Sequence, residues 1–134
     1  MNTDDIIQQA VAYIEENLGQ DLSLDDLSKK TGYSKFYLSR LFSDITGCTI
    51  YKYIKMRRIT EAARRLTDTE AAIIDIAFEA GYQSQQAFTN AFTHIYQCSP
   101  QAYRTAGIFN PKMKRYGKFI QMGVRLHTVR SYAA

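Results

Sequence analysis

One stretch of this chain occurs twice, with residues 27–53 corresponding to residues 76–103. Most corresponding residues lie fifty positions apart: the pairs are Leu38/Phe88, Leu41/Ala91, Phe42/Phe92, Ile45/Ile95, Cys48/Cys98 and Tyr53/Tyr103. The pair Gly32-Tyr33 and Gly81-Tyr82 is one position closer, so the second copy has one extra residue in its turn. Because a stacked repeat protein needs at least about three copies, two copies predict one small helical unit used twice.

Each copy has the sequence signature of a helix-turn-helix, which is a short helix, a glycine turn and a second capped helix. In the first copy, Ser23 and Ser34 are expected to cap the two helices, and Gly32 and Gly47 to end them. In the second copy, a helix over about 71–80 ends at Gly81, and a helix capped by Ser84 runs to about Tyr96.

Apolar spacing predicts three more helices outside these pairs. An amphipathic helix occupies the first 18 residues and is expected to end near Gly19, a longer helix covers 50–66, and a last turn starts at Pro100. We therefore predict an all-α fold of about seven helices, with two helix-turn-helix subdomains joined by a long linker helix. The predicted parts are an N-terminal subdomain (1–49), the linker helix (50–66), a C-terminal subdomain (67–106) and a basic C-terminal tail (107–134).

Charge is distributed unevenly along a chain whose net charge is only +4. Residues 1–20 carry four acids and no base, whereas residues 21–66 carry ten bases and five acids. Residues 67–106 carry one base and four acids, and residues 107–134 carry six bases and no acid. Basic segments of this kind indicate either a polyanionic partner or a solvated surface. We expect the tail either to dock against the helices or to be a solvated extension.

Composition argues against several classes of protein. The chain has no run of about eighteen apolar residues and no secretory signal, so we expect no membrane span and a cytoplasmic location. Its two cysteines and two histidines lack zinc spacing, so no metal and no cofactor are expected. No catalytic set of serine, histidine and carboxylate residues and no glycine-rich phosphate loop is recognisable, so an enzyme is not expected.

The second helix of the first copy has two different faces. Leu38, Leu41, Phe42 and Ile45 form an apolar stripe, and the opposite positions are Phe36, Ser39, Arg40 and Ser43. Arginine donates two hydrogen bonds to guanine O6 and N7, and an aromatic ring can contact thymine methyl groups. We therefore predict that Phe36, Ser39 and Arg40 read bases, while Ser34 and Lys35 at the helix start meet phosphate.

The corresponding face of the second copy is polar but uncharged. It carries Gln85, Gln86, Thr89 and Asn90. Glutamine and asparagine can hydrogen-bond adenine N6 and N7, and a merely solvated face usually carries Lys and Glu instead. These four residues are therefore predicted to read bases in a second major groove.

Two such helices in one chain suggest how the protein binds DNA. Dimeric helix-turn-helix proteins place two recognition helices about 34–36 Å apart, which is one turn of DNA. A linker helix of about 16 residues spans ~24 Å, so with the width of the flanking units two successive major grooves come within reach. Some bending of the DNA is expected.

Several strings resemble the AraC/XylS family of transcription regulators. They are GYSKFYLSRLF (32–42), TG (46–47), YI (53–54), RR (57–58), GYQSQQAFTNAF (81–92) and SPQAYR (99–104). The resemblance covers about residues 5–106 and is greatest to the short members of the MarA, SoxS and Rob type. It implies seven helices, an asymmetric promoter site in double-stranded DNA and contact with RNA polymerase.

The resemblance also implies residue roles. It places Phe36, Ser39 and Arg40, and the set Gln85, Gln86, Thr89 and Asn90, at base-contacting positions. Lys35, Tyr103 and Arg104 match phosphate neighbours. Phe36 stands where close relatives usually have Trp, Ser39 where they often have Gln, and Asn90 where Arg is usual, so a different site sequence is expected.

The function implied is that of a bacterial activator that associates with the nucleoid and controls stress-defence or antibiotic-resistance genes. No separate domain for a small-molecule ligand is expected in 134 residues. The charge difference suggests that the first subdomain anchors the protein on DNA and the second modulates binding. The alternative is a protein-interaction module or antagonist that binds a regulator or polymerase without reading DNA.

Overall fold

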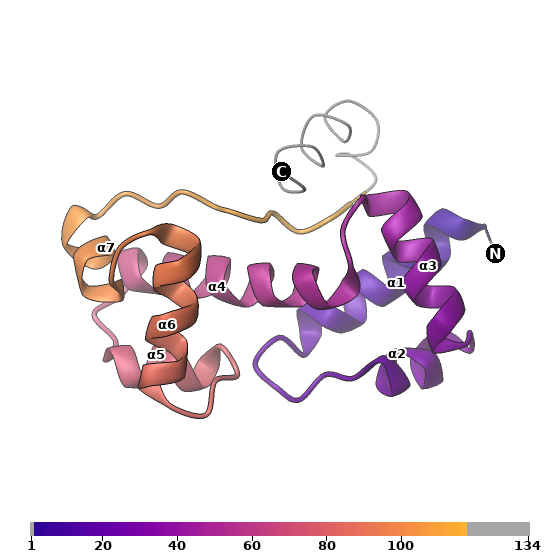
Figure 1. Ribbon diagram of the computed structural model, residues 1–134, viewed down its shortest axis with the longest axis horizontal. Coiled ribbons are helices and arrows are strands. Elements are labelled where there is room, and N and C mark those ends of the chain that lie inside the picture. Colours follow the sequence, from indigo (N-terminus) through magenta and orange to yellow (C-terminus); the bar gives the residue numbers. More distant parts are fainter. Residues whose placement is uncertain (1, 118–134) are drawn as a thin grey trace. The chain divides into compact units, whose positions relative to one another are not determined.

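The computed structural model describes residues 2–117, which form seven α-helices and no strand (Figure 1). The helices are α1 (Thr3–Glu16), α2 (Leu24–Thr31), α3 (Lys35–Thr46), α4 (Ile50–Asp68), α5 (Ile73–Glu79), α6 (Gln85–Tyr96) and α7 (Pro100–Ala106). The predicted all-α class is confirmed. None of the described helices has the length and apolar character that crossing a membrane requires.

Side-chain caps explain where most of these helices begin. Asn2 caps α1, and Ser23 forms a reciprocal capping box with Asp26 at the start of α2. The hydroxyls of Ser34 and Ser84 accept hydrogen bonds from the backbone N–H groups of Tyr37 and Ala87, at 3.1 and 3.0 Å. Each cap satisfies an N–H group that has no partner within its helix. Both expected serine caps of the second helices are therefore confirmed.

The ends of α2 and α3 follow glycines, whereas the end of α1 does not. Gly32 and Gly47 adopt left-handed conformations (φ 81° and 75°) directly after α2 and α3, as predicted. The expectation that Gly19 ends α1 is wrong, because α1 stops at Glu16 with Asn17 as its C-terminal cap. Gly19 instead allows a close backbone approach, since a Cβ there would lie 2.5 Å from the carbonyl oxygen of Glu79.

The chain forms two compact units. The described residues of unit 1 are 2–17, 22–54 and 115–117, and those of unit 2 are 18–21 and 55–114. In unit 1, α1 packs on α2 and α3. Its core consists of fully buried apolar side chains, including Ile7, Val11, Ile14, Leu27, Leu38 and Phe42. Unit 1 is thus a helix-turn-helix covered by an amphipathic N-terminal helix.

Unit 2 is built in the same way around α5 and α6. The core there joins residues of α4 to Ile76 and Ala77 of α5 and to Phe88 and Phe92 of α6. The α4 residues concerned are Ile59, Ala62, Ala63 and Leu66. A helix that is apolar along one stripe buries that stripe against its neighbours, which fixes the opposite face of α6 toward solvent.

The internal repeat extends to the packing of aromatic rings. In unit 1 the rings of Phe42 and Tyr53 meet edge to face at 5.4 Å, and in unit 2 Phe92 and Tyr103 meet in the same way at 5.4 Å. Edge-to-face contacts of this kind add stability beyond the buried area. The two copies therefore share side-chain contacts as well as helix positions.

The first part of the C-terminal tail is docked and is not a solvated extension. We call residues 107–117 the C-terminal segment. In unit 2, the N–H of Met113 donates to Oγ1 of Thr60 at 3.0 Å, and Nη1 of Arg57 donates to the carbonyl of Met113 at 2.8 Å. In unit 1, the N–H of Tyr116 donates to the Tyr53 hydroxyl at 3.0 Å. Residues 118–134 lie outside the described part of the chain.

Candidate nucleic-acid interface

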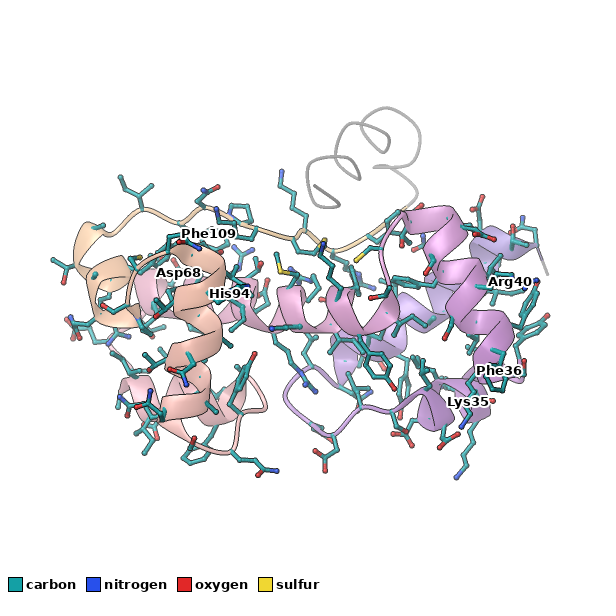
Figure 2. All side chains as sticks on the ribbon, in the orientation of Figure 1. Lys35, Phe36, Arg40, Asp68, His94 and Phe109 are labelled. Carbon is teal, nitrogen blue, oxygen red and sulfur yellow. The ribbon has the colours of Figure 1, made fainter. Side chains whose placement is uncertain are left out.

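The outer face of α3 carries the predicted first set of base-reading residues. Leu38 and Phe42 are fully buried, whereas Phe36 is 81% exposed and Arg40 is exposed. Ser39 is half-buried beside them. Figure 2 shows Lys35, Phe36 and Arg40 projecting outward from α3. An aromatic side chain this exposed contributes little to the stability of the fold, so its location favours a role in contact with a partner.

The turn before α3 is fixed by short-range hydrogen bonds. The hydroxyl of Ser28 donates to the carbonyl of Tyr33 at 2.7 Å, and the N–H of Tyr33 donates to Oγ1 of Thr31 at 3.3 Å. The rings of Tyr33 and Tyr37 then pack at 5.4 Å. These contacts hold α2 and α3 in one arrangement, so the outer face of α3 is presented by a rigid support.

The two predicted phosphate residues at the start of α3 are already engaged within unit 1. The Ser34 hydroxyl accepts the N–H of Tyr37, and Nζ of Lys35 lies 3.3 Å from Oδ1 of Asp25. Both partners of this ion pair are well exposed, so the pair contributes little stability and its lysine can exchange Asp25 for another anion.

The outer face of α6 carries the second predicted set. Gln85, Gln86 and Asn90 are exposed and Thr89 is half-buried, while Phe88 and Phe92 are fully buried. Nε2 of Gln86 donates to Oδ1 of Asn90 at 2.9 Å. This bond links the two amides, so Oε1 of Gln86 and Nδ2 of Asn90 form a neighbouring acceptor and donor. The structure therefore brings these predicted residues together on one face.

The longer turn before α6 is held by different contacts, which involve Gly81 and the guanidinium of Arg58. Gly81 has a φ of 88°, and a Cβ there would lie 3.3 Å from the guanidinium carbon of Arg58. That guanidinium donates to the carbonyls of Leu18 and Gln20 at 2.7 and 2.6 Å. Tyr82 packs its ring on Phe88, and its burial raises the pKa of its phenol. The extra residue of the second copy is thus accommodated without loosening α6.

Tyr103 and Arg104, also predicted to lie near phosphate, have roles inside unit 2. Tyr103 is only 7% exposed, and its hydroxyl accepts the N–H of Asn110 at 2.7 Å. Nε and Nη2 of Arg104 donate to the carbonyls of Leu66 and Ala71 at 3.0 and 2.7 Å. Two of the three guanidinium nitrogens are thus committed to the fold, and the phosphate contact stays a prediction.

Unit 2 also carries an ion pair that its sequence did not reveal. Nε and Nη2 of Arg65 donate to the two carboxylate oxygens of Glu79 at 2.8 and 3.0 Å. The hydrogen bonds from Arg65 lower the pKa of Glu79 below its ordinary value. This pairing joins α4 to α5 and neutralises one of the four acids of residues 67–106.

One exposed residue beside the first predicted set was missed. Tyr51, in the first turn of α4, is 63% exposed and lines a groove together with Phe36, Ser39 and Lys35. The sequence signal was its offset of fifty from Gln101, which places it in the repeated pattern although not on the second helix.

Two capped helix-turn-helix units with solvent-facing second helices define a DNA-binding protein of the helix-turn-helix class. The helix-turn-helix domain family matches residues 27–106. The regulatory protein SoxS of Escherichia coli is 43% identical over 104 residues, covering 78% of this chain and 97% of that protein. The chain belongs to the AraC-type family of DNA-binding transcription regulators and is similar to its SoxS- and Rob-like members.

Two further relatives agree with this assignment. The transcriptional activator AarP of Providencia stuartii is 42% identical over 99 residues, covering 74% of this chain and 73% of that protein. The DNA-binding domain of AdpA, a global transcriptional factor solved in complex with a target DNA, superimposes with a TM-score of 0.70. It is 25% identical, and the match covers 77% of this chain and 92% of that domain.

Proposed function

We propose that this regulator binds an asymmetric promoter site as a monomer, with α3 and α6 acting as recognition helices in successive major grooves, and that it activates transcription. The main support is the contrast between two outer faces on one repeated scaffold. Phe36 and Arg40 of α3 correspond to Gln86 and Asn90 of α6. Unlike faces favour unlike half-sites, and a chain that carries both needs no second copy.

The proposed base contacts follow from side-chain chemistry. Arg40 reads a guanine through two hydrogen bonds, and Phe36 contacts a thymine methyl group. The linked amides of Gln86 and Asn90 present a donor and an acceptor to an adenine, with Gln85 and Thr89 beside them. Ser34 and Lys35 contact the phosphate backbone at the start of α3.

Selection of bound fragments from random duplexes tests this proposal. We expect an asymmetric consensus, in which Arg40→Ala and Asn90→Ala relax preference at different base positions. A palindromic consensus would contradict the monomeric mode, and no consensus at all would contradict base reading.

Recruitment of RNA polymerase is the second part of the proposal, and the outer side of α5 supports it. Ile74 and Phe78 lie one turn apart on this helix and are both about half exposed, with the acidic Asp75 between them. Neighbouring exposed apolar side chains of this kind mark contact sites for other proteins. We propose that this face binds polymerase at stress-defence or antibiotic-resistance promoters.

In vitro transcription with purified bacterial RNA polymerase separates DNA binding from recruitment of the polymerase. The double variant Ile74→Ala/Phe78→Ala is expected to bind DNA normally and to lose activation. Ile108→Ala is the matched control, because Ile108 is also exposed but lies outside α5. Full activation by the double variant would contradict the proposal that this surface binds polymerase. Loss of DNA binding as well would mean that the two residues support the fold instead.

A further inference from the structure

A groove in unit 1 lies directly beside the proposed base-reading residues. Its volume is about 380 Å³, and three helices line it. The start of α2 contributes Leu24 and Asp25, α3 contributes Lys35, Phe36 and Ser39, and the first turn of α4 contributes Tyr51. The groove therefore continues the outer face of α3 onto α4.

The two charged side chains of this groove pair with each other, whereas its two aromatic rings are exposed. Lys35 is paired with Asp25, and Ser23 at the edge is engaged in the capping box of α2. Phe36 and Tyr51 are 81% and 63% exposed. The groove therefore offers a partner two exposed aromatic rings next to the Ser39 hydroxyl, and its lysine can exchange Asp25 for a phosphate.

The internal repeat shows that this aromatic pair is specific to unit 1. Fifty positions after Phe36 and Tyr51 stand Gln86 and Gln101, both exposed. Thr49 and Ser99, which precede Tyr51 and Gln101 by two residues, cap their helices in the same way, accepting the N–H groups of Lys52 and Ala102. The backbone positions are therefore equivalent. At these two positions unit 1 carries aromatic rings, whereas unit 2 carries amide side chains.

We infer that this groove holds the 5-methyl group of a thymine, and that Tyr51 is a specificity-determining residue together with Phe36. The inference rests on the proposed function, since it requires α3 to enter a major groove. The thymine methyl is the one apolar group that the major-groove edges of the bases display, and aromatic or apolar side chains contact it. Rings entering from two helices enclose such a methyl more completely than Phe36 alone.

Thymine-to-deoxyuridine exchange tests the inference, because it removes only the methyl group. The full-length protein is titrated against the duplex that it selects from random sequence and against copies in which each thymine in turn is deoxyuridine. Burial of one methyl-sized group predicts a loss of about fourfold in affinity at the position that the groove contacts. Other thymines should be exchanged with little effect.

The same titrations with Tyr51→Ala and Tyr51→Gln assign the effect. Both variants are expected to bind the thymine duplex more weakly and to lose the distinction between thymine and deoxyuridine at that position. Tyr51→Gln installs the residue of the second copy, so it keeps a polar exposed side chain if the alanine variant proves unstable. Phe78→Ala is the control, because Phe78 is an exposed aromatic residue of α5 outside the groove and should discriminate like the wild type.

Two results would overturn parts of the inference, and a third would overturn the proposed function. Unchanged discrimination in both Tyr51 variants would overturn the role of Tyr51 and leave the proposed function standing. Sequence-specific binding that is insensitive to deoxyuridine at every position would overturn the methyl site itself. If the wild type selects no consensus from random duplexes, the proposed function fails first and the inference fails with it.

Discussion

At the scale of single residues, Arg40 carries the most direct prediction. Replacing Arg40 with alanine should cost about 1–3 kcal/mol in binding to the selected site and relax preference at one base position. Arg40→Lys keeps the charge but loses the planar pair of donors, so it should show nearly the same loss. Lys30→Ala, which removes an exposed base from α2, is the charge-matched control. If Arg40→Ala weakens binding to random DNA equally, Arg40 is a phosphate contact.

Gln97 carries a prediction about stability. It has a φ of 63° at the end of α6, where the first copy has Gly47 with a φ of 75°. A left-handed conformation is strained for a residue with a Cβ atom, by roughly 1–2 kcal/mol, although glycine is also more flexible in the unfolded chain. Gln97→Gly should therefore raise the free energy of unfolding by up to about 1 kcal/mol in urea titrations. A decrease would mean that the hydrogen bond from its amide to the His94 carbonyl outweighs the strain.

At the scale of elements, the C-terminal segment depends on polar side chains of α4. Thr60 is fully buried, and its hydroxyl oxygen accepts the N–H of Met113. Thr60→Val keeps the shape but leaves this N–H without an acceptor, which should cost about 1–3 kcal/mol. The half-exposed Thr67 on the same helix bonds only to helix carbonyls and to the neighbouring Asp68, so Thr67→Val is the control. Equal destabilisation by both variants would show that the segment adds nothing.

Other contacts of the segment explain why sequence could not decide between docking and a solvated extension. Phe109 lies under the guanidinium of Arg64 at 4.5 Å, and Lys112 lies over the ring of Tyr96 at 5.4 Å (Figure 2 labels Phe109). Burial raises the pKa of the Tyr96 phenol, so its hydroxyl stays protonated and donates to the Asn110 carbonyl at 2.8 Å. These contacts follow no helical or alternating spacing, and periodicity was the only signal that sequence offered for this region.

The helices themselves were predictable because local chemistry determines their ends. Serine caps and left-handed glycines placed α2 and α3 to within a residue, and the cap of Ser84 placed the start of α6. Predictions were less accurate where tertiary contacts decide: α4 continues to Asp68 rather than 66, and α5 begins at Ile73 without a side-chain cap. Gly19 was assigned to a helix end, but its role depends on Glu79, sixty positions away.

The predicted faces of α3 and α6 are both exposed, because helical spacing fixes which side chains lie opposite the core. Sequence could not show that Lys35 pairs with Asp25 or that Arg104 binds two carbonyls, since both depend on how helices meet. It also passed over Tyr51, whose exposure depends on the packing of α4 beside α3 in unit 1. The base-reading roles themselves stay predictions.

At the scale of the whole molecule, charge distribution predicts how salt affects binding. Truncation after residue 117 removes three bases, Lys118, Arg125 and Arg130, but keeps the docked C-terminal segment. If these bases contact phosphate, the slope of log affinity against log salt should become shallower by up to about 2.7, with an unchanged free energy of unfolding. Truncation after residue 106 should in addition destabilise the protein. An unchanged slope after truncation at residue 117 would mean that residues 118–134 do not contact DNA.

Hydroxyl-radical footprinting of the selected duplex shows whether one chain places two recognition helices in neighbouring major grooves. We predict two protected windows about 10 base pairs apart, of which one weakens in the double variant Gln86→Ala/Asn90→Ala and the other in Arg40→Ala. A single window of about half a helical turn, unchanged when Gln86 and Asn90 are replaced, would mean that α6 does not enter a major groove.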